Sequence, residues 1–172
     1  DLNVFLELLN PAWYAFAERN VLVPNPEWFN PSWLPHLKGL DAVWCKTHDA
    51  TGIFAQHHPR TEYIGWTSRD CLEAKVPRER SLIHIAGDSV SKGTRHVIAA
   101  MARMPEYHLT ILTSQRWGPV TANVTVLGRL EGPEFLVEQN RHMIHLCPST
   151  YEGFGHYINE ARSVGALRAL CA

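Results

Sequence analysis

From residue 81 to residue 164, short apolar runs of strand length alternate with segments of helical pattern. This alternation predicts right-handed crossovers and a parallel sheet with helices on both faces. Ligands of such sheets bind at the carboxyl ends of the strands, so the loops after the strands are where a site is expected. The expected strands are 81–86, 108–113, 124–128 and 143–147, and the expected helices are 93–104, 133–141 and 156–164.

The first 70 residues have a different character, because tryptophan and proline are frequent and regular elements must therefore be short. Strands are expected at 3–8, 20–24, 42–46 and 63–65, with helices at 11–19, 31–40 and 47–56. The pattern predicts a partial N-terminal domain at 1–70, a linker at 71–80 and an α/β domain at 81–172. Arg168 interrupts the apolar run after Gly165 and is unfavourable in a buried strand. The last strand is therefore expected to be incomplete or frayed, and the chain, which begins at Asp1 without a methionine, to be a truncated fragment.

Length and charge limit the classes of function. The 172 residues suffice for one domain with part of another, and 16 basic against 17 acidic residues give no field typical of a nucleic-acid binder. The cysteines Cys45, Cys71, Cys147 and Cys171 show no CxxC spacing, which favours reduced thiols in a cytoplasmic protein. With no signal peptide and no apolar run of about 18 residues, we expect no integral membrane segment, although peripheral membrane association is compatible with the sequence.

The loop after the 143–147 run combines glycines with acidic residues. Gly153 and Gly155 let the backbone turn sharply, and the N–H groups and dipole of the following helix favour an anion. Glu152 and Glu160 are eight residues apart, close to a whole number of helical turns, so both could accept hydrogen bonds from hydroxyls of one ligand. An isolated pair of this kind would as readily be solvated surface. In this context the pattern predicts a phosphorylated ligand.

A second glycine loop follows the first strand of this domain. After Gly87, the hydroxyls of Ser89 and Ser91 can donate hydrogen bonds, and Lys92 supplies the positive charge that a departing diphosphate needs. A solvated lysine near a helix cap is the alternative for this loop taken alone. Because both glycine loops end parallel strands, they could face one cleft.

Both loops carry a family resemblance. The run from Pro148 to Ala161 resembles the donor-site motif of the retaining glycosyltransferases of family 4, also called group 1, which have the GT-B fold. Gly87 and the Lys92-Gly93 pair resemble the second donor-site signature of that family, and residues 126–129 resemble its segment beside the nucleobase. Asp88 departs from the pattern, because many members have a basic residue there. The resemblance implies a GT-B-type, Rossmann-like C-terminal donor domain that lacks its last elements, with a partial α/β acceptor domain before it.

The activity that the resemblance implies is transfer of a sugar from a nucleoside diphosphate sugar, of UDP or GDP type, to an acceptor hydroxyl with retention of anomeric configuration. The acceptor would be a sugar, a lipid-linked molecule or a polysaccharide, in bacterial polysaccharide or glycoconjugate synthesis. Glu152 would bind the transferred sugar, Glu160 the ribose, and Lys92 the leaving diphosphate without a metal. The implied catalytic residues are Lys92 and Glu152, and the implied donor-binding residues are Gly87, Ser89, Ser91, Gly153, Phe154, Gly155 and Glu160.

Other chemistries are less well supported. His142 and His145 lack the supporting cysteine or carboxylate spacing of a zinc site, so we expect neither a metal nor another cofactor. The glutamates do not resemble the closely placed acid and nucleophile of a glycosidase, and the loops lack the GxGxxG pattern of NAD enzymes. Two alternatives stay open: a non-catalytic module that binds a nucleotide sugar, suggested by Asp88 and the truncation, and an epimerase of the same architecture.

Overall fold

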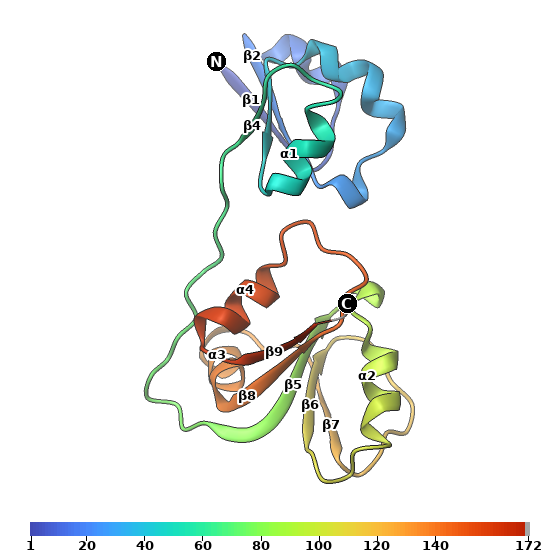
Figure 1. The fold of residues 1–172 in the computed structure, drawn as a ribbon, viewed down its shortest axis with the longest axis vertical. Helices are drawn as coiled ribbons and strands as arrows, with labels where there is room; N and C mark the ends of the chain where they lie inside the picture. The colour runs from blue at the N-terminus through green and yellow to red at the C-terminus, as the bar shows by residue number, and fades with distance from the viewer. Residues whose placement is uncertain (171–172) are drawn as a thin grey trace. The chain divides into compact units, whose positions relative to one another are not determined.

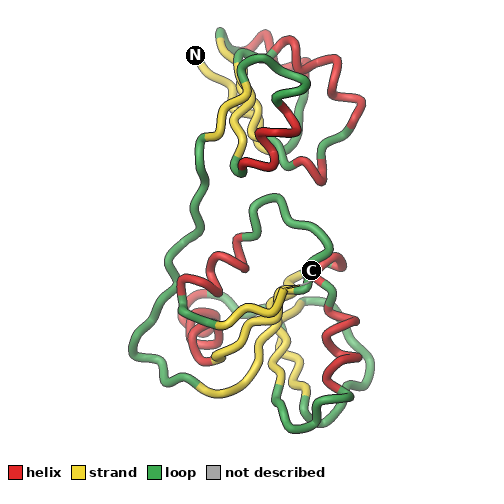
Figure 2. The backbone as a smooth tube through the Cα atoms, in the orientation of Figure 1, coloured by secondary structure: helices red, strands yellow, loops and turns green. Residues whose placement is uncertain are grey.

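The computed structural model describes residues 1–170, which form two compact units with one parallel sheet each (Figures 1 and 2). The first unit comprises Asp1–Thr67 together with the short segment Glu152–Phe154, and the second comprises Ser68–Tyr151 and the residues from Gly155 onward. Residues 64–78, between the two sheets, contain neither helix nor strand. The α/β class and the parallel sheets expected from the sequence are confirmed.

The first unit contains four parallel strands in sequential order. Its two longer proline-led segments form 3₁₀ helices where ordinary helices were expected, since Pro11 and Pro31 begin them and Pro35 removes a backbone donor inside the second. The strands are β1 (Leu2–Leu6), β2 (Arg19–Val23), β3 (Ala42–Cys45) and β4 (Thr61–Tyr63), and the helical segments are η1 (Pro11–Phe16), η2 (Pro26–Trp28), η3 (Pro31–Gly39) and α1 (His48–Phe54).

One face of this sheet holds the core of the first unit. Leu22, Leu37 and Val43 are fully buried, and Phe54 of α1 packs edge-on against Phe29 with ring centroids 5.0 Å apart. Thr47 caps α1, because its Oγ1 accepts a hydrogen bond from the Ala50 N–H at 3.1 Å. The unit therefore has an apolar core of its own.

The second unit contains five parallel strands in the order β7-β6-β5-β8-β9. Figure 1 shows α2 on one face of this sheet and α3 and α4 on the other, as the alternating sequence pattern predicts. Its elements are β5 (Glu79–Gly87), η4 (Val90–Lys92), α2 (Thr94–Met101), β6 (Leu109–Thr113), β7 (Val124–Leu127), α3 (Gly132–Arg141), β8 (His142–Cys147), α4 (His156–Ser163) and β9 (Leu167–Leu170).

Burial explains why the strand and helix pattern of this unit is so clear in the sequence. Every residue of β6 is buried, and Val97 and Met101 of α2 belong to the same apolar cluster as Leu109 and Ile111. At the other edge, β9 pairs with β8 over all four of its residues, and each of them is exposed. Among residues 1–170, β9 lies at the edge of this sheet, where an exposed Arg168 is tolerated, and its pairing with β8 corrects the expectation of a frayed segment.

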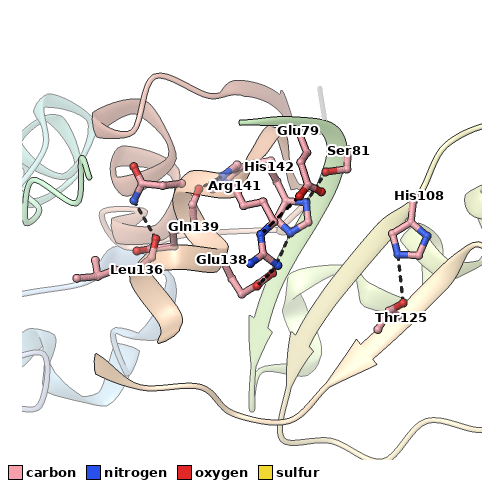
Figure 3. A network of polar contacts seen from close by, with 11 residues as sticks. Glu79, Ser81, His108, Thr125, Leu136, Glu138, Gln139, Arg141 and His142 are labelled. Atoms are coloured by element: carbon pink, nitrogen blue, oxygen red, sulfur yellow. Dashed lines mark hydrogen bonds and ion pairs between the residues drawn. The ribbon is translucent and has the colours of Figure 1, made fainter. Parts of the chain in front are cut away.

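A polar network fixes the junction of α3 and β8, which follow one another without a loop. Ser81 Oγ lies 2.8 Å from His142 Nδ1, and His142 Nε2 lies 3.1 Å from the carboxylate of Glu138 (Figure 3). The guanidinium of Arg141 donates to the same carboxylate at 2.6 Å. Burial lowers the pKa of His142, while Glu138 opposes this shift. The network ties the end of α3 to β5.

Strand order reverses next to β5, which creates a topological switch point. The connection through α2 leads from β5 to β6 on one side, whereas β8 lies on the other side of β5. The loops that leave the carboxyl ends of β5 and β8 therefore emerge as neighbours, the arrangement in which doubly wound sheets bind ligands. No helix among residues 1–170 is both long and apolar enough to cross a membrane.

Candidate functional site

The two glycine loops predicted from the sequence meet at this switch point. The Thr150 N–H donates a hydrogen bond to the Ser91 carbonyl at 3.1 Å. Gly93 has a φ of 74°, and a Cβ atom at that position would lie 2.5 Å from the Pro148 carbonyl oxygen. Only glycine fits a left-handed position with so close a backbone contact. The β5–α2 loop and residues 148–151 of the β8–α4 loop thus form one joined surface in the second unit.

The loop after β5 is held by hydrogen bonds that its backbone carbonyls accept from residues 113–115. The Gly87 carbonyl accepts hydrogen bonds from Thr113 Oγ1 at 2.8 Å and from the Ser114 N–H at 3.2 Å, and Gly87 itself has a φ of 55°. Asp88 is exposed, and its carbonyl, not its carboxylate, accepts a hydrogen bond from Gln115 Nε2 at 2.7 Å. The negative charge of Asp88 is therefore in solvent.

Hydroxyl groups and a lysine complete this loop. Ser89 Oγ and Ser91 Oγ are 2.8 Å apart, and Lys92 Nζ lies 3.6 Å from the ring centroid of Tyr157. Tyr157, in the first turn of α4, is buried, and its hydroxyl is hydrogen-bonded to Ser149 Oγ. A cation over an aromatic ring is stabilised by about 0.5–2 kcal/mol. The ring of Tyr157 therefore holds the ammonium of Lys92 beside the start of α4.

The start of α4 is built by a glycine. Gly155 has a φ of 75°, makes no side-chain cap, and its carbonyl accepts hydrogen bonds from the Ile158 and Asn159 N–H groups at 3.0 Å each. The amino end of this helix carries the positive end of its dipole and favours an anion. The ammonium of Lys92 and the amino end of α4 are thus two neighbouring sources of positive potential.

The predicted residues Glu152, Gly153 and Phe154 belong to the segment that groups with the first unit, so they are not part of the unit that holds the two joined loops. All three are half-buried, and Gly153 lacks the positive φ that Gly155 has. Because α4 begins at His156, Glu152 precedes the helix, and helical periodicity does not relate it to Glu160. That part of the sequence argument was wrong.

Glu160 lies in α4 and contacts α3. Its Oε2 accepts a hydrogen bond from Gln139 Nε2 at 3.0 Å, and Gln139 is 1% exposed. The Oε1 of Gln139 is buried without a hydrogen-bond partner among residues 1–170, which costs about 1–3 kcal/mol. Glu160 itself is half-buried. Glu160, the glutamate predicted to bind the ribose, is thus hydrogen-bonded through its carboxylate to the buried amide of Gln139.

A buried histidine links the elements beneath the two loops. His84 of β5 is fully buried, with its Nδ1 2.9 Å from the Leu146 carbonyl and its Nε2 3.0 Å from Thr94 Oγ1. A carbonyl only accepts, so Nδ1 carries the proton and Nε2 accepts from the threonine hydroxyl. Burial lowers the pKa of His84, and nearby Lys92 lowers it further. The neutral imidazole joins β5, β8 and the first residue of α2.

A cavity of about 330 Å³ opens beside the first loop. Arg95 and Gln115 contribute polar groups to its lining, and the indole Nε1 of Trp117 is buried without a hydrogen-bond partner in the described part of the chain. Its lining residues are Val90, Gly93, Thr94, Arg95, His96, Gln115, Trp117 and Thr150. The cavity extends the joined loops toward β6.

Sequence reasoning missed three of the residues that shape this region. Tyr157 shares a buried face of α4 with Ala161, and their i, i+4 spacing could have indicated this. His84 is the one polar residue in the apolar run 82–86 of β5, and such an interruption can be recognised in the sequence. Gln139 gave no signal, because its role depends on a contact between two helices. Among residues 1–170, no three histidine, cysteine or acidic side chains gather as metal ligands.

No protein-family model and no curated protein matches this chain. Solved structures do match it. The pneumococcal O-GlcNAc transferase GtfA, in complex with UDP and GlcNAc, has a TM-score of 0.72 and 17% identity over 99% of this chain and 41% of that one. Sucrose-phosphate synthase from Thermosynechococcus elongatus has a TM-score of 0.77 and 14% identity over 98% of this chain and 55% of that one.

Trehalose-6-phosphate synthase, studied with bisubstrate glycomimetics for glycosyl transfer with retention, has a TM-score of 0.72 and 12% identity over 99% of this chain and 58% of that one. At these identities the likeness shows the fold, which is GT-B. The chain spans about half the length of the solved structures it matches, with 41%, 55% and 58% of the three covered.

Proposed function

We propose that this chain carries the donor-binding part of a glycosyltransferase that moves a sugar from a nucleoside diphosphate sugar to an acceptor hydroxyl. The observation that supports the proposal most is the position of Lys92 on the Tyr157 ring, beside the start of α4. A diphosphate there would meet the ammonium, the helix dipole and the hydroxyls of Ser89 and Ser91 together.

The chemistry follows from where charge develops in the reaction. Breaking the bond between the anomeric carbon and the diphosphate leaves an additional negative charge on the phosphate oxygens, and Lys92 with the α4 dipole would stabilise that charge. We propose that Glu152 accepts a hydrogen bond from the transferred sugar and Glu160 from the ribose. Gly153, Phe154 and Gly155 would donate backbone N–H groups, and Gly87 would allow close approach of the donor.

Finer features of the proposal rest on the motif resemblance. We propose retention of anomeric configuration, membership of family 4, a UDP or GDP donor, no metal requirement and a cytoplasmic location. Trehalose-6-phosphate synthase, a structural neighbour studied for transfer with retention, supports the stereochemical part. The acceptor would be a sugar, a lipid-linked molecule or a polysaccharide, in bacterial polysaccharide or glycoconjugate synthesis.

The proposal is tested first by calorimetry of the chain with UDP, GDP and ADP, and with inorganic pyrophosphate. We expect binding of one nucleotide, and binding weakened about tenfold or more by Lys92→Ala, because a hydrogen bond between charged partners contributes about 1.5–3 kcal/mol. Lys38→Ala, in the first unit, serves as the matched control and should bind as the wild type does. Equal affinity of the wild type and Lys92→Ala would contradict the role of Lys92.

A nucleotide-sugar-binding module without turnover is the second candidate, and Asp88 at a usually basic position favours it. Transfer or hydrolysis of the donor by the longest form of the protein separates the two. Lys92→Ala and Glu152→Gln should abolish turnover if the first proposal holds. Tight binding of the donor without transfer or hydrolysis would support the module instead.

A further inference from the structure

A buried amide of α3 contacts the glutamate that the proposed function places at the ribose. Gln139 Nε2 donates a hydrogen bond to Glu160 Oε2 at 3.0 Å, and no other glutamine contacts this carboxylate among residues 1–170. We propose that Gln139 is a positioning residue that fixes the carboxylate of Glu160 for the ribose hydroxyls of the donor. This inference rests on the proposed function and deepens it.

The chemistry of the pair determines how the amide is oriented. An ionised carboxylate only accepts hydrogen bonds, so the NH₂ group of Gln139 must face Glu160 and its Oε1 must face away. With Oε2 taken by Gln139, the Oε1 of Glu160 makes no hydrogen bond to the described residues and is left for a ligand. Because the side chain of Glu160 is half-buried, the unpaired oxygen combines partial exposure with a fixed orientation.

The backbone that carries Gln139 is itself held in place. Its carbonyl accepts a hydrogen bond from His145 Nε2 of β8 at 2.9 Å. The next residue, Asn140, donates from its side chain to the Cys71 carbonyl at 2.8 Å and to the Leu136 carbonyl at 2.9 Å. The end of α3 is therefore tied to the sheet and to the segment before β5, and Gln139 reaches Glu160 from a rigid support.

The contact between Gln139 and Glu160 is difficult to explain by its effect on folding. Gln139 is 1% exposed, and its Oε1 has no hydrogen-bond partner in the described part of the chain. An unsatisfied buried acceptor is destabilising, and an apolar side chain of similar volume would avoid it. An amide at this position is thus explained by what its NH₂ group does for Glu160.

The test compares the 172-residue wild type with Gln139→Met by calorimetry. Three probes are used: the one of UDP, GDP and ADP that binds tightest, the 2′,3′-dideoxy form of that nucleotide, and inorganic pyrophosphate. We expect Gln139→Met to bind the ribonucleotide about tenfold more weakly and to bind the other two probes as the wild type does, because only the ribonucleotide presents hydroxyls to Glu160. Its melting temperature should be equal to or above that of the wild type. Gln56→Met, an exposed glutamine of the first unit, is the matched control and should change none of these values.

Two further variants keep the test decisive. Gln139→Asn retains an amide but is one methylene too short to reach Glu160, and should show the same selective loss. In the Glu160→Gln background, Gln139→Met should cause no additional loss of ribonucleotide affinity, since the two residues act through one contact. This cycle distinguishes a positioning residue from a general packing residue.

Several outcomes would overturn the inference. Ribonucleotide affinity unchanged in both Gln139 variants would do so, and so would an equal loss of pyrophosphate affinity, which indicates general damage. If the wild type binds a ribonucleotide and its dideoxy form equally well, the ribose role of Glu160 and Gln139 is wrong while the proposed donor site stands. If none of the three nucleotides binds the wild type, the proposed function fails together with the inference.

Discussion

Acidification should destabilise the second unit through one buried imidazole. His145 of β8 is 2% exposed, and its Nε2 donates to the Gln139 carbonyl. Burial lowers the pKa of His145 to about 4. In the unfolded chain the same imidazole has its ordinary pKa of about 6.5. The unfolded chain therefore binds more protons between these two values, and stability falls as the pH falls through this range.

The size of the effect follows from the two pKa values. Stability from this group is fully present above pH 6.5, decreases by about 1.4 kcal/mol for each pH unit below that value, and levels off near pH 4. Between pH 7 and pH 5 the loss from His145 alone is about 2 kcal/mol. The pKa values of His84 and His142 are also lowered by burial, so the wild type should lose more than this amount in total.

The assay is hydrogen exchange of the β8 amides at pH 5 and pH 7, expressed as protection factors so that the intrinsic rates cancel. His145→Gln keeps an N–H donor toward Gln139 but cannot titrate, and it should remove about 2 kcal/mol of the pH dependence of wild-type protection. His96→Gln replaces an exposed imidazole that water solvates in both states, and it should keep the wild-type profile. An equal pH dependence in the wild type and His145→Gln would refute the reasoning.

Three other substitutions test the joined loops and the independence of the units. Gly93→Ala places a Cβ 2.5 Å from the Pro148 carbonyl oxygen at a φ of 74°. Urea unfolding should therefore show the second unit destabilised by about 2–4 kcal/mol. An unchanged unfolding midpoint would mean that the contact is easily relieved. Tyr157→Leu removes the ring under Lys92 and should weaken pyrophosphate binding about three- to tenfold in calorimetry, whereas Tyr157→Phe keeps the ring and should bind like the wild type. Phe54→Ala should lower the protection of β3 amides by about 3–5 kcal/mol while pyrophosphate binding persists, and loss of that binding would show that the units fold together.

The fold of the second unit could be predicted because burial leaves a direct trace in the sequence. All five residues of β6 are buried, and its short run of leucine, isoleucine and β-branched threonine is typical of a buried strand. In α2, Val97 and Met101 are buried at helical spacing. In the first unit the proline-led segments were read as ordinary helices, because a 3₁₀ helix and a short α-helix share their starting signals. The last strand was expected to be incomplete or frayed because of Arg168, whereas all four residues of β9 pair with β8 and the arginine is exposed.

The candidate site likewise has residues that the sequence indicates and residues that it does not indicate. Glycines and a lysine after strand-like runs are local signals, so Gly87, Lys92 and Gly155 could be chosen from sequence. Contacts between elements are not local: the ring of Tyr157 under Lys92 and the amide of Gln139 under Glu160 depend on how α4 packs in the unit. Sequence could thus indicate which loops to examine, and the structure adds the side chains that hold their functional groups.

The central place of β5 also has a consequence for how the second unit folds. Leu82 of β5 pairs with Leu109 of β6 and with Ile144 of β8, so the second pairing closes a loop more than twice as long as the first. The additional loop-closure entropy is about 0.7 kcal/mol. We therefore expect β5, β6 and α2 to associate early and β8 to dock late. Because the two glycine loops become neighbours only when β8 docks, the capacity to bind a ligand there should appear at the last step of folding.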